Sequence, residues 1–330
     1  MKPTLLSLHV GGREVGLHTY GILIGVGCAV AIALAYRDAR RRALDGGKIL
    51  DLSFWMLVAG LVGSRIFYVA LNAGAFARTC TGDGEDLPVR SLGALIGDCT
   101  RALQIWEGGL IFYGGVVAAA LTAFLFARRQ GWGFWTLGDI YAPSLAIGHA
   151  FGRLGCYAAG CCFGKACAAG ARWCVSFGPD SVAYEELRAV SALPASASVT
   201  PPLFPTQLYE AAGELAIFAI LLMMRRRAAL RRPGTLILLY AALYGLLRFT
   251  VELFRGDFAR RFLVQLHTPG LARWLGLPAG EPALLSTGQV VSVLIAAGAA
   301  VALVLRAQER RKRLKELNRE EQGRESGPAS

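Results

Sequence analysis

The chain has 330 residues, of which 54% are hydrophobic and only 18% are charged, and its formal net charge is +12. A positive mean hydropathy with so few charges excludes an ordinary soluble domain. The basic excess does not indicate nucleic-acid binding, because in membrane proteins basic residues gather in cytoplasmic loops and contact anionic lipid. We therefore expect an integral membrane protein whose partners include membrane lipid and exclude nucleic acid.

Apolar windows of roughly 18–22 residues recur along the chain, and each is long enough to cross a bilayer. We count about seven, with approximate ranges 18–36, 51–71, 109–127, 134–151, 206–224, 234–254 and 286–306. The sequence thus predicts an all-α integral membrane protein with about seven transmembrane helices. Met1–Gly16 has no apolar run that ends at a small-residue cleavage site, so we expect the first apolar segment to be a retained helix.

Arginine and lysine clusters follow the first, third, fifth and seventh apolar segments. With seven segments these clusters lie on one side, which the positive-inside rule assigns to the cytoplasm. The N-terminus would then lie outside and the C-terminus in the cytoplasm. This topology predicts one polytopic membrane catalytic domain over 1–306 and a basic cytoplasmic tail over 307–330, with outer loops at about 72–105, 152–204 and 255–285.

The cysteines concentrate in the predicted outer loops, where disulfides are permitted. Cys80 and Cys99 lie in the first outer loop, and we expect them to pair. Five more lie in or near the second outer loop: Cys156, Cys161, Cys162, Cys167 and Cys174. Because five is odd, at least one of them is free unless Cys28 or another chain takes part.

The adjacent pair Cys161-Cys162 leaves three interpretations open. Zinc and thioredoxin-like sites usually separate their cysteines by two residues, and His149 is the only histidine near this pair. A structural disulfide that involves Cys156, Cys161 or Cys162 fits the pattern better than a redox-active pair or a metal site. We therefore expect no metal.

The most informative stretch is Gly152–Gly164, which places Arg153 and three cysteines at the end of a membrane-length apolar segment. A charge at that depth is costly to bury and is usually kept for substrate, ion or lipid chemistry. Its glycines allow backbone and ligand to approach closely. The alternative is an arginine that snorkels from a glycine-packed helix end.

Further polar residues recur at helical spacing inside the apolar segments. Spacings of three and four residues place Gln207, Glu210 and Glu214 on one helix face. The same spacing joins three residues of the sixth segment, which allows an internal ion pair beside a second guanidinium: Arg248, Glu252 and Arg255. Guanidinium groups bind phosphate bidentately, so these residues favour a polar chamber for an anionic lipid. Alternatively, the sixth-segment residues only staple the helix bundle.

At these residues the chain resembles the prolipoprotein diacylglyceryl transferases. The resemblance covers nearly the whole membrane body. It consists of short motifs in a fixed order, each weak alone: Tyr20-Gly21, Gly63-Ser64-Arg65, Trp106-Glu107-Gly108-Gly109, Gly114-Gly115, Asp139 with Ala142-Pro143, Gly152 to Gly164, Pro205 to Glu210, Tyr244-Gly245, Arg248-Phe249, and Val251 to Arg255 with Asp257. Their order within a seven-helix, N-out topology makes the joint match specific.

The resemblance implies that the protein transfers the diacylglyceryl group of phosphatidylglycerol to the lipobox cysteine thiol of prolipoproteins and releases glycerol phosphate. It implies a bacterial cytoplasmic (inner) membrane location with the active site toward the outer side, and no metal or organic cofactor. Two arginines would hold the head group and stabilise the departing phosphate: Arg153 and Arg248. Glu252 and Arg255 would orient these two arginines or line the lipid pocket. A polar wall would comprise Tyr20, Gln207, Tyr209 and Glu210, and room for lipid would be left by Gly114, Gly115 and Gly164.

The chain departs from the family pattern at several positions. Tyr113 stands where the family usually has the histidine that is its candidate base, so Tyr113 would act as the base or as a hydrogen-bond donor. Cys156, Ala159 and Cys161 stand in a block that usually has asparagines and a glutamate, and Phe204 replaces a usual histidine. We expect a divergent branch in which a disulfide replaces a polar network. The alternatives are a paralogue with another lipid or acceptor, a membrane thiol oxidoreductase that uses the outer cysteines, and a non-enzymatic transporter or lipid-binding protein.

Overall fold

The computed structural model describes residues 4–10, 13–74, 109–167, 173–194, 196–225, 232–256, 262–266, 270, 274 and 284–325. Several residues singled out above lie outside these ranges: Cys80, Cys99, Trp106, Glu107, Gly108 and Asp257. The predicted pairing of Cys80 with Cys99 therefore stays a prediction.

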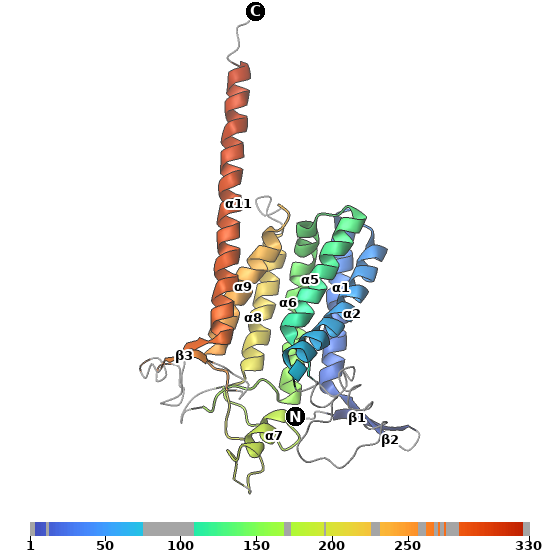
Figure 1. Cartoon of the computed structure of the whole chain (residues 1–330), viewed down its shortest axis with the longest axis vertical. Coiled ribbons are helices and arrows are strands. Elements are labelled where there is room, and N and C mark those ends of the chain that lie inside the picture. The colour runs from blue at the N-terminus through green and yellow to red at the C-terminus, as the bar shows by residue number, and fades with distance from the viewer. Residues whose placement is uncertain are drawn as a thin grey trace, which may run out of the picture. The chain divides into compact units, whose positions relative to one another are not determined.

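The chain divides into two compact units, Met1–Leu34 with Gly138–Ser330, and Ala35–Leu137. The first unit holds most of α1 (Thr19–Arg41) and α6 (Phe134–Ala159), together with α7 (Val182–Ala189), α8 (Thr206–Met224), α9 (Thr235–Glu252), α11 (Thr287–Glu325) and the strands (Figure 1). The second unit holds α2 (Gly46–Leu71), α5 (Phe112–Gln130) and the remaining parts of α1 and α6.

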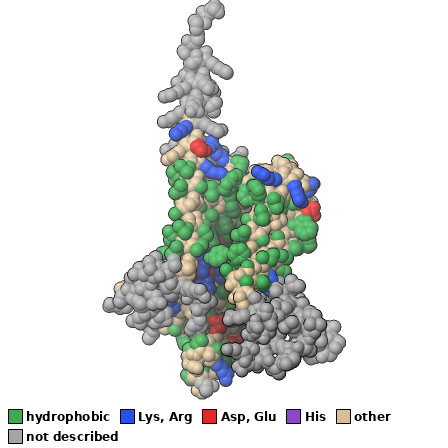
Figure 2. Space-filling view, viewed as in Figure 1, with side chains coloured by type: hydrophobic (Ala, Val, Ile, Leu, Met, Phe, Trp, Pro, Cys, Tyr) green, Lys and Arg blue, Asp and Glu red, His purple; other side chains and the backbone are tan. Residues whose placement is uncertain are grey.

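Six of the described helices are long and apolar enough to cross a membrane: α1, α2, α5, α8, α9 and the Thr287–Glu309 part of α11. Helix α6 is also long, at 26 residues, and contains Pro143. Hydrophobic side chains cover much of the visible helix surface, as expected for helices that face lipid (Figure 2). The predicted all-α membrane architecture is confirmed, while the count of seven and the orientation stay predictions.

Two of the basic clusters predicted to be cytoplasmic meet at one end of α9 and α11. The Nη1 of Arg306 donates to the carbonyl of Pro233 at 2.6 Å, and the Nη1 of Arg232 donates to the carbonyl of Arg306 at 3.4 Å. Arg232 precedes α9 and Arg306 follows the apolar part of α11. This contact agrees with the alternation of basic clusters on which the topology was based.

Short regular elements lie before α1 and within two of the regions predicted to be outer loops. A hairpin of β1 (Thr4–Val10) and β2 (Arg13–His18) precedes α1. Strands β3 (Phe262–Leu266) and β4 (Leu284–Ser286) pair antiparallel just before α11. Helix α7 follows α6 and precedes α8 along the chain. The Ser181 hydroxyl caps α7 by accepting a hydrogen bond from the backbone N–H of Tyr184 at 3.2 Å.

Glycines let α2 and α5 pack closely in the second unit. A Cβ added at Gly114 would lie 2.6 Å from the carbonyl oxygen of Gly63, and one added at Gly115 would lie 2.9 Å from that of Gly60. Such distances require glycine at the crossing, as in small-residue packing between membrane helices. The structure thus gives Gly114 and Gly115 a packing role with α2, and their role in leaving room for lipid stays a prediction.

Asp139 in α6 caps the N-terminus of α9. Its carboxylate accepts backbone N–H groups from Gly234 at 2.8 Å, Leu236 at 2.8 Å and Ile237 at 3.0 Å. The first N–H groups of a helix have no partner within the helix, and a buried cap supplied by a neighbour satisfies them. Asp139 therefore fixes the start of α9 beside α6, which sets the register of the site described below.

Replacement of Asp139 by alanine is expected to lower the free energy of unfolding by about 2 kcal/mol, because two buried N–H groups and one part-buried N–H group lose a charged acceptor. The melting temperature of the purified protein in detergent measures this loss. Asp139→Asn keeps an acceptor oxygen and should recover part of the stability. Equal stability of Asp139→Ala and the unmodified protein would contradict the capping role.

Candidate active site

Facing pairs of charged and polar side chains join α6 to α8. The Nδ1 of His149 lies 2.7 Å from Oε1 of Glu214, and the Nη2 of Arg153 lies 3.0 Å from Oε1 of Glu210. His149 and Arg153 are one helical turn apart on α6, and Glu210 and Glu214 are one turn apart on α8. The two helices therefore run antiparallel here, and both carboxylates are buried against α6.

Helix α9 lies beside α6 at this site, and the two helices run in the same direction. Asp139 contacts residues 234–237 at the start of α9, and ten residues later the ring of His149 lies 5.2 Å from that of Tyr244. Because both helices rise 1.5 Å per residue, this register brings Arg248 to the level of Arg153. Tyr244 interacts electrostatically with both arginines and with Glu210 and Glu214, which agrees with that placement.

Arg248 has a buried donor that is left for a ligand. Its Nη2 lies 2.7 Å from Oε2 of Glu252, which confirms the expected ion pair of the sixth segment. Its Nη1 is buried and has no hydrogen-bond partner among the described residues. An unsatisfied buried N–H of a guanidinium is costly, so this atom marks a place where an anionic group would bind favourably.

Glu252 is fixed by the first turn of α11. The Ser286 hydroxyl donates to Oε1 of Glu252 at 3.0 Å. Ser286 also accepts from the backbone N–H of Gln289 at 3.2 Å, while the Gln289 side chain accepts from the backbone N–H of Ser286 at 3.1 Å. This reciprocal pair is a capping box. Glu252 thus holds Arg248 in one orientation from a rigid support.

His149 is the residue of this site that the sequence reasoning did not assign. Its Nε2 lies 3.2 Å from the Nε of Arg153, which donates to it, while its Nδ1 faces Glu214. A guanidinium only donates, so Nε2 is the acceptor nitrogen and Nδ1 carries the proton toward Glu214. The sequence does carry a signal for His149. It lies four residues before Arg153, just as Glu214 lies four residues after Glu210, so each pair shares one helix face.

The proposed polar wall divides between two environments. Gln207 is buried, and its Nε2 donates to the carbonyl of Cys161 at 2.7 Å. The ring of Tyr209 contacts an apolar neighbour, with its centroid 5.8 Å from that of Phe254 in an edge contact. Tyr20 packs over Gly155, where an added Cβ would lie 3.1 Å from the tyrosine ring, and 41% of Tyr20 is exposed.

Gly164 lies where three backbone segments cross. Its N–H donates to the carbonyl of Phe204 at 3.0 Å, and it forms an antiparallel bridge with Arg255. A Cβ at Gly164 would lie 2.7 Å from the Cβ of Phe204 and 2.8 Å from the carbonyl oxygen of Phe254. A side chain at Gly164 would therefore collide with this close backbone crossing, and the role of Gly164 in leaving room for lipid stays a prediction.

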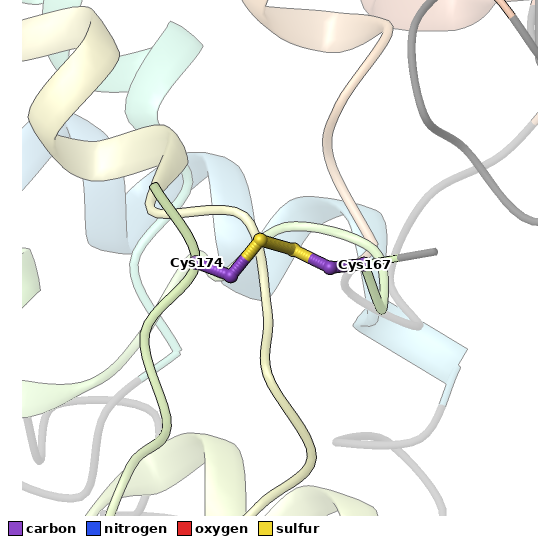
Figure 3. Close-up of a disulfide and its surroundings, with 2 residues drawn as sticks. All are labelled: Cys167 and Cys174. Atoms are coloured by element: carbon purple, nitrogen blue, oxygen red, sulfur yellow. A yellow bond between two sulfur atoms is a disulfide. The ribbon is translucent and has the colours of Figure 1, made fainter. Parts of the chain in front are cut away.

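A disulfide joins Cys167 to Cys174 beside this crossing (Figure 3). Both cysteines pack against Phe204 in one apolar cluster. The sequence alone does not single out this pair among the five cysteines in or near the second outer loop. The bond closes a short loop, so it holds the two segments that pair with Leu203.

Gly164→Ala is expected to destabilise the outer segment by about 1–3 kcal/mol, because the new methyl group overlaps backbone atoms that cannot move away. Gly178→Ala is the matched control, since an added Cβ there meets no atom within 4 Å. Limited proteolysis of both variants reports the difference. Equal protease resistance would show that the crossing tolerates a side chain.

The comparison with known proteins decides the family. A family model described as prolipoprotein diacylglyceryl transferase matches residues 7–305. The chain belongs to the prolipoprotein diacylglyceryl transferase family. Its similarity to individual members is moderate but spans most of each sequence, which agrees with a divergent branch.

Three relatives illustrate this similarity, and each is named phosphatidylglycerol–prolipoprotein diacylglyceryl transferase. The protein from Ruegeria pomeroyi is 30% identical over 93% of this chain and 96% of its own length. The protein from Thermosynechococcus vestitus is 30% identical over 74% of this chain and 79% of its own length. That from Listeria monocytogenes serovar 1/2a is 31% identical over 76% and 79%.

Tyr113, which the resemblance places at the family's histidine position, lies in α5 of the second unit. It is 55% exposed, and its ring contacts that of Phe112 edge-on. Its hydroxyl makes no hydrogen bond to the described part of the chain. The role of Tyr113 as base therefore stays a prediction, with no acid–base partner on the described residues.

Three free thiols lie close together in the block around Arg153. Cys156, Cys161 and Cys162 are unbonded, and their sulfur atoms lie within 4.8 Å of one another. The sequence had predicted a disulfide among these residues. The structure bonds a different pair, Cys167 with Cys174, and leaves the three thiols as a cluster.

Proposed function

We propose that this protein transfers the diacylglyceryl group of phosphatidylglycerol to the lipobox cysteine thiol of prolipoproteins and releases glycerol phosphate. The family and the names of its relatives support this reaction. The observation that carries it at the level of residues is the buried Nη1 of Arg248, which lies level with Arg153 and has no hydrogen-bond partner in the part of the chain that the structure describes. The bacterial inner membrane, with the active site toward its outer side, is part of the same proposal.

Arg153 and Arg248 bind the phosphate of the lipid head group. Each is held by a carboxylate, Glu210 and Glu252, and each keeps further N–H donors for the phosphate oxygens. The phosphate gains negative charge as its bond to the glyceryl carbon breaks, and donors fixed in advance stabilise that charge. Gln207, Tyr209 and Tyr20 belong to the surrounding binding surface.

His149 accepts the proton of the incoming thiol at Nε2, and Glu214 orients the ring and stabilises the imidazolium. In the structure Nε2 accepts a hydrogen bond from the Nε of Arg153 at 3.2 Å. When a phosphate draws the guanidinium toward itself, this nitrogen becomes available. Lipid binding would thus activate the base, which assigns to a residue of α6 the task that the family's histidine would perform at Tyr113.

The bond changes balance without a cofactor. The thiol proton moves to Nε2 of His149, and the thiolate sulfur attacks the glyceryl carbon that carries the phosphate. The carbon–oxygen bond breaks with its electron pair on the oxygen, so glycerol phosphate leaves as an anion held by Arg153 and Arg248. The product is a thioether between the lipobox cysteine and diacylglycerol.

A transfer assay tests this function directly. Purified protein in phosphatidylglycerol vesicles is mixed with a lipobox peptide, and mass spectrometry looks for the diacylglyceryl adduct on the cysteine. Phosphatidylethanolamine vesicles and a Cys→Ser peptide are the controls. Adduct formation only with phosphatidylglycerol and the intact peptide supports the proposal. Folded protein that binds lipid but forms no adduct would overturn it.

A further inference from the structure

The end of α6 folds back so that three cysteine side chains meet. The N–H of Cys161 donates to the carbonyl of Cys156 at 3.1 Å, and Gly160 has a φ of 73°. Cys162 follows with a φ of 57°, which only a strongly determined backbone imposes on a non-glycine residue. The reversal brings the three sulfur atoms within 4.8 Å of one another.

This turn is held from outside the cluster by the first turn of α8. The Gln207 Nε2 donates to the carbonyl of Cys161 at 2.7 Å, and the Thr206 hydroxyl donates to the carbonyl of Cys162 at 2.8 Å. Both donors are buried. The backbone that carries the thiols is therefore fixed by the rest of the protein, and a ligand that used the thiols would bind a prepared site.

The cluster is made of sulfur ligands alone. Among the described residues, no histidine, aspartate or glutamate joins Cys156, Cys161 and Cys162 in this group. Thiols release their protons when they bind a metal ion, and the charge of the cation then balances that of the thiolates.

We propose that Cys156, Cys161 and Cys162 form a three-thiolate site for a soft metal cation of the Cu(I) or Zn(II) class. Thiolate ligands select these ions over Mg²⁺ and Ca²⁺. With metal–sulfur bonds of about 2.3 Å, tetrahedral coordination sets the sulfurs about 3.8 Å apart, which small side-chain rotations within the observed cluster supply.

An oxygen beside the cluster is placed to accept a hydrogen bond from a water that serves as the fourth metal ligand. The Oε1 of Gln207 belongs to the amide that binds the Cys161 carbonyl, is buried, and accepts no hydrogen bond from the described residues. A water on the metal would donate to this oxygen, as outer-shell groups do around metal ligands. The sequence spacing had argued against a metal, because it could not show that the turn brings Cys156 beside the adjacent pair.

Metal titration of the full-length protein tests the site independently of transfer activity. Reduced, anaerobic protein in detergent is titrated with Zn(II), with Cu(I) against a chromogenic chelator, and with Cd(II), whose sulfur charge-transfer absorption reports thiolate ligation. We expect one ion per chain and a loss of affinity of about 100-fold or more in Cys161→Ser and Cys156→Ser. The control Cys28→Ser, a free cysteine in α1, should bind like the unmodified protein.

A second measurement uses the unmodified protein, so it still tests the site if the cysteine variants fail to fold. Peptide-resolved alkylation of the unmodified protein should show that the metal protects Cys156, Cys161 and Cys162 but not Cys28. Reduced protein that binds no stoichiometric metal, or protection that extends equally to Cys28, would overturn the proposal. So would a disulfide among the three residues in protein whose thiols were trapped before lysis.

Discussion

Arg153→Ala is expected to lower the rate of diacylglyceryl transfer by about 100-fold or more, because one of the two guanidinium groups that stabilise the departing phosphate is lost. Arg153→Lys keeps the charge but loses the forked geometry, so we expect an intermediate rate. The adduct assay with phosphatidylglycerol measures all three proteins. Arg188→Ala, in the last turn of α7, is the matched control and should leave the rate unchanged.

The loss of Arg153 also leaves Glu210 as a buried carboxylate without its cation, which would destabilise the bundle. The double variant Arg153→Ala with Glu210→Gln removes that charge. If the double variant melts like the unmodified protein and still fails to transfer lipid, the arginine itself is required. Recovery of transfer in the double variant would reduce Arg153 to a structural partner of Glu210.

His149→Ala is expected to lower transfer by about 100-fold at neutral pH, because the thiol loses its proton acceptor. The defect should shrink as the pH rises through about 8.5, since the acceptor thiol then ionises without help. A pH–rate profile of the variant beside the unmodified protein measures this change. A defect of the same size at every pH would show that His149 only supports the fold.

Two further substitutions separate the candidates for the base. Glu214→Gln should weaken transfer less than His149→Ala, because the glutamine still contacts Nδ1 but no longer stabilises the imidazolium. Tyr113→Phe should stay within about threefold of the unmodified rate if His149 is the acceptor. A large, pH-dependent defect in Tyr113→Phe with a normal His149→Ala would return the role to Tyr113.

The helical membrane architecture and the family followed from the sequence, because both depend on patterns that are local along the chain. Apolar runs of membrane length predict helices wherever they occur. The ordered motifs around Arg153, Gln207 and Arg248 indicated the transferase family. The pair of Arg248 with Glu252 was predicted because residues four apart on one helix must be neighbours.

Contacts between helices were decided only by the tertiary structure, because spacing within one helix does not say which helix it faces or in what register. The antiparallel register of α6 and α8 pairs His149 with Glu214 and Arg153 with Glu210. The sequence shows Asp139 only as a polar residue in an apolar segment, and the structure shows that it caps α9. The cysteines follow the same rule, because residue types and spacing allow several pairings. The backbone reversal after α6 brings three thiols together, and the crossing at Gly164 places the disulfide partners side by side.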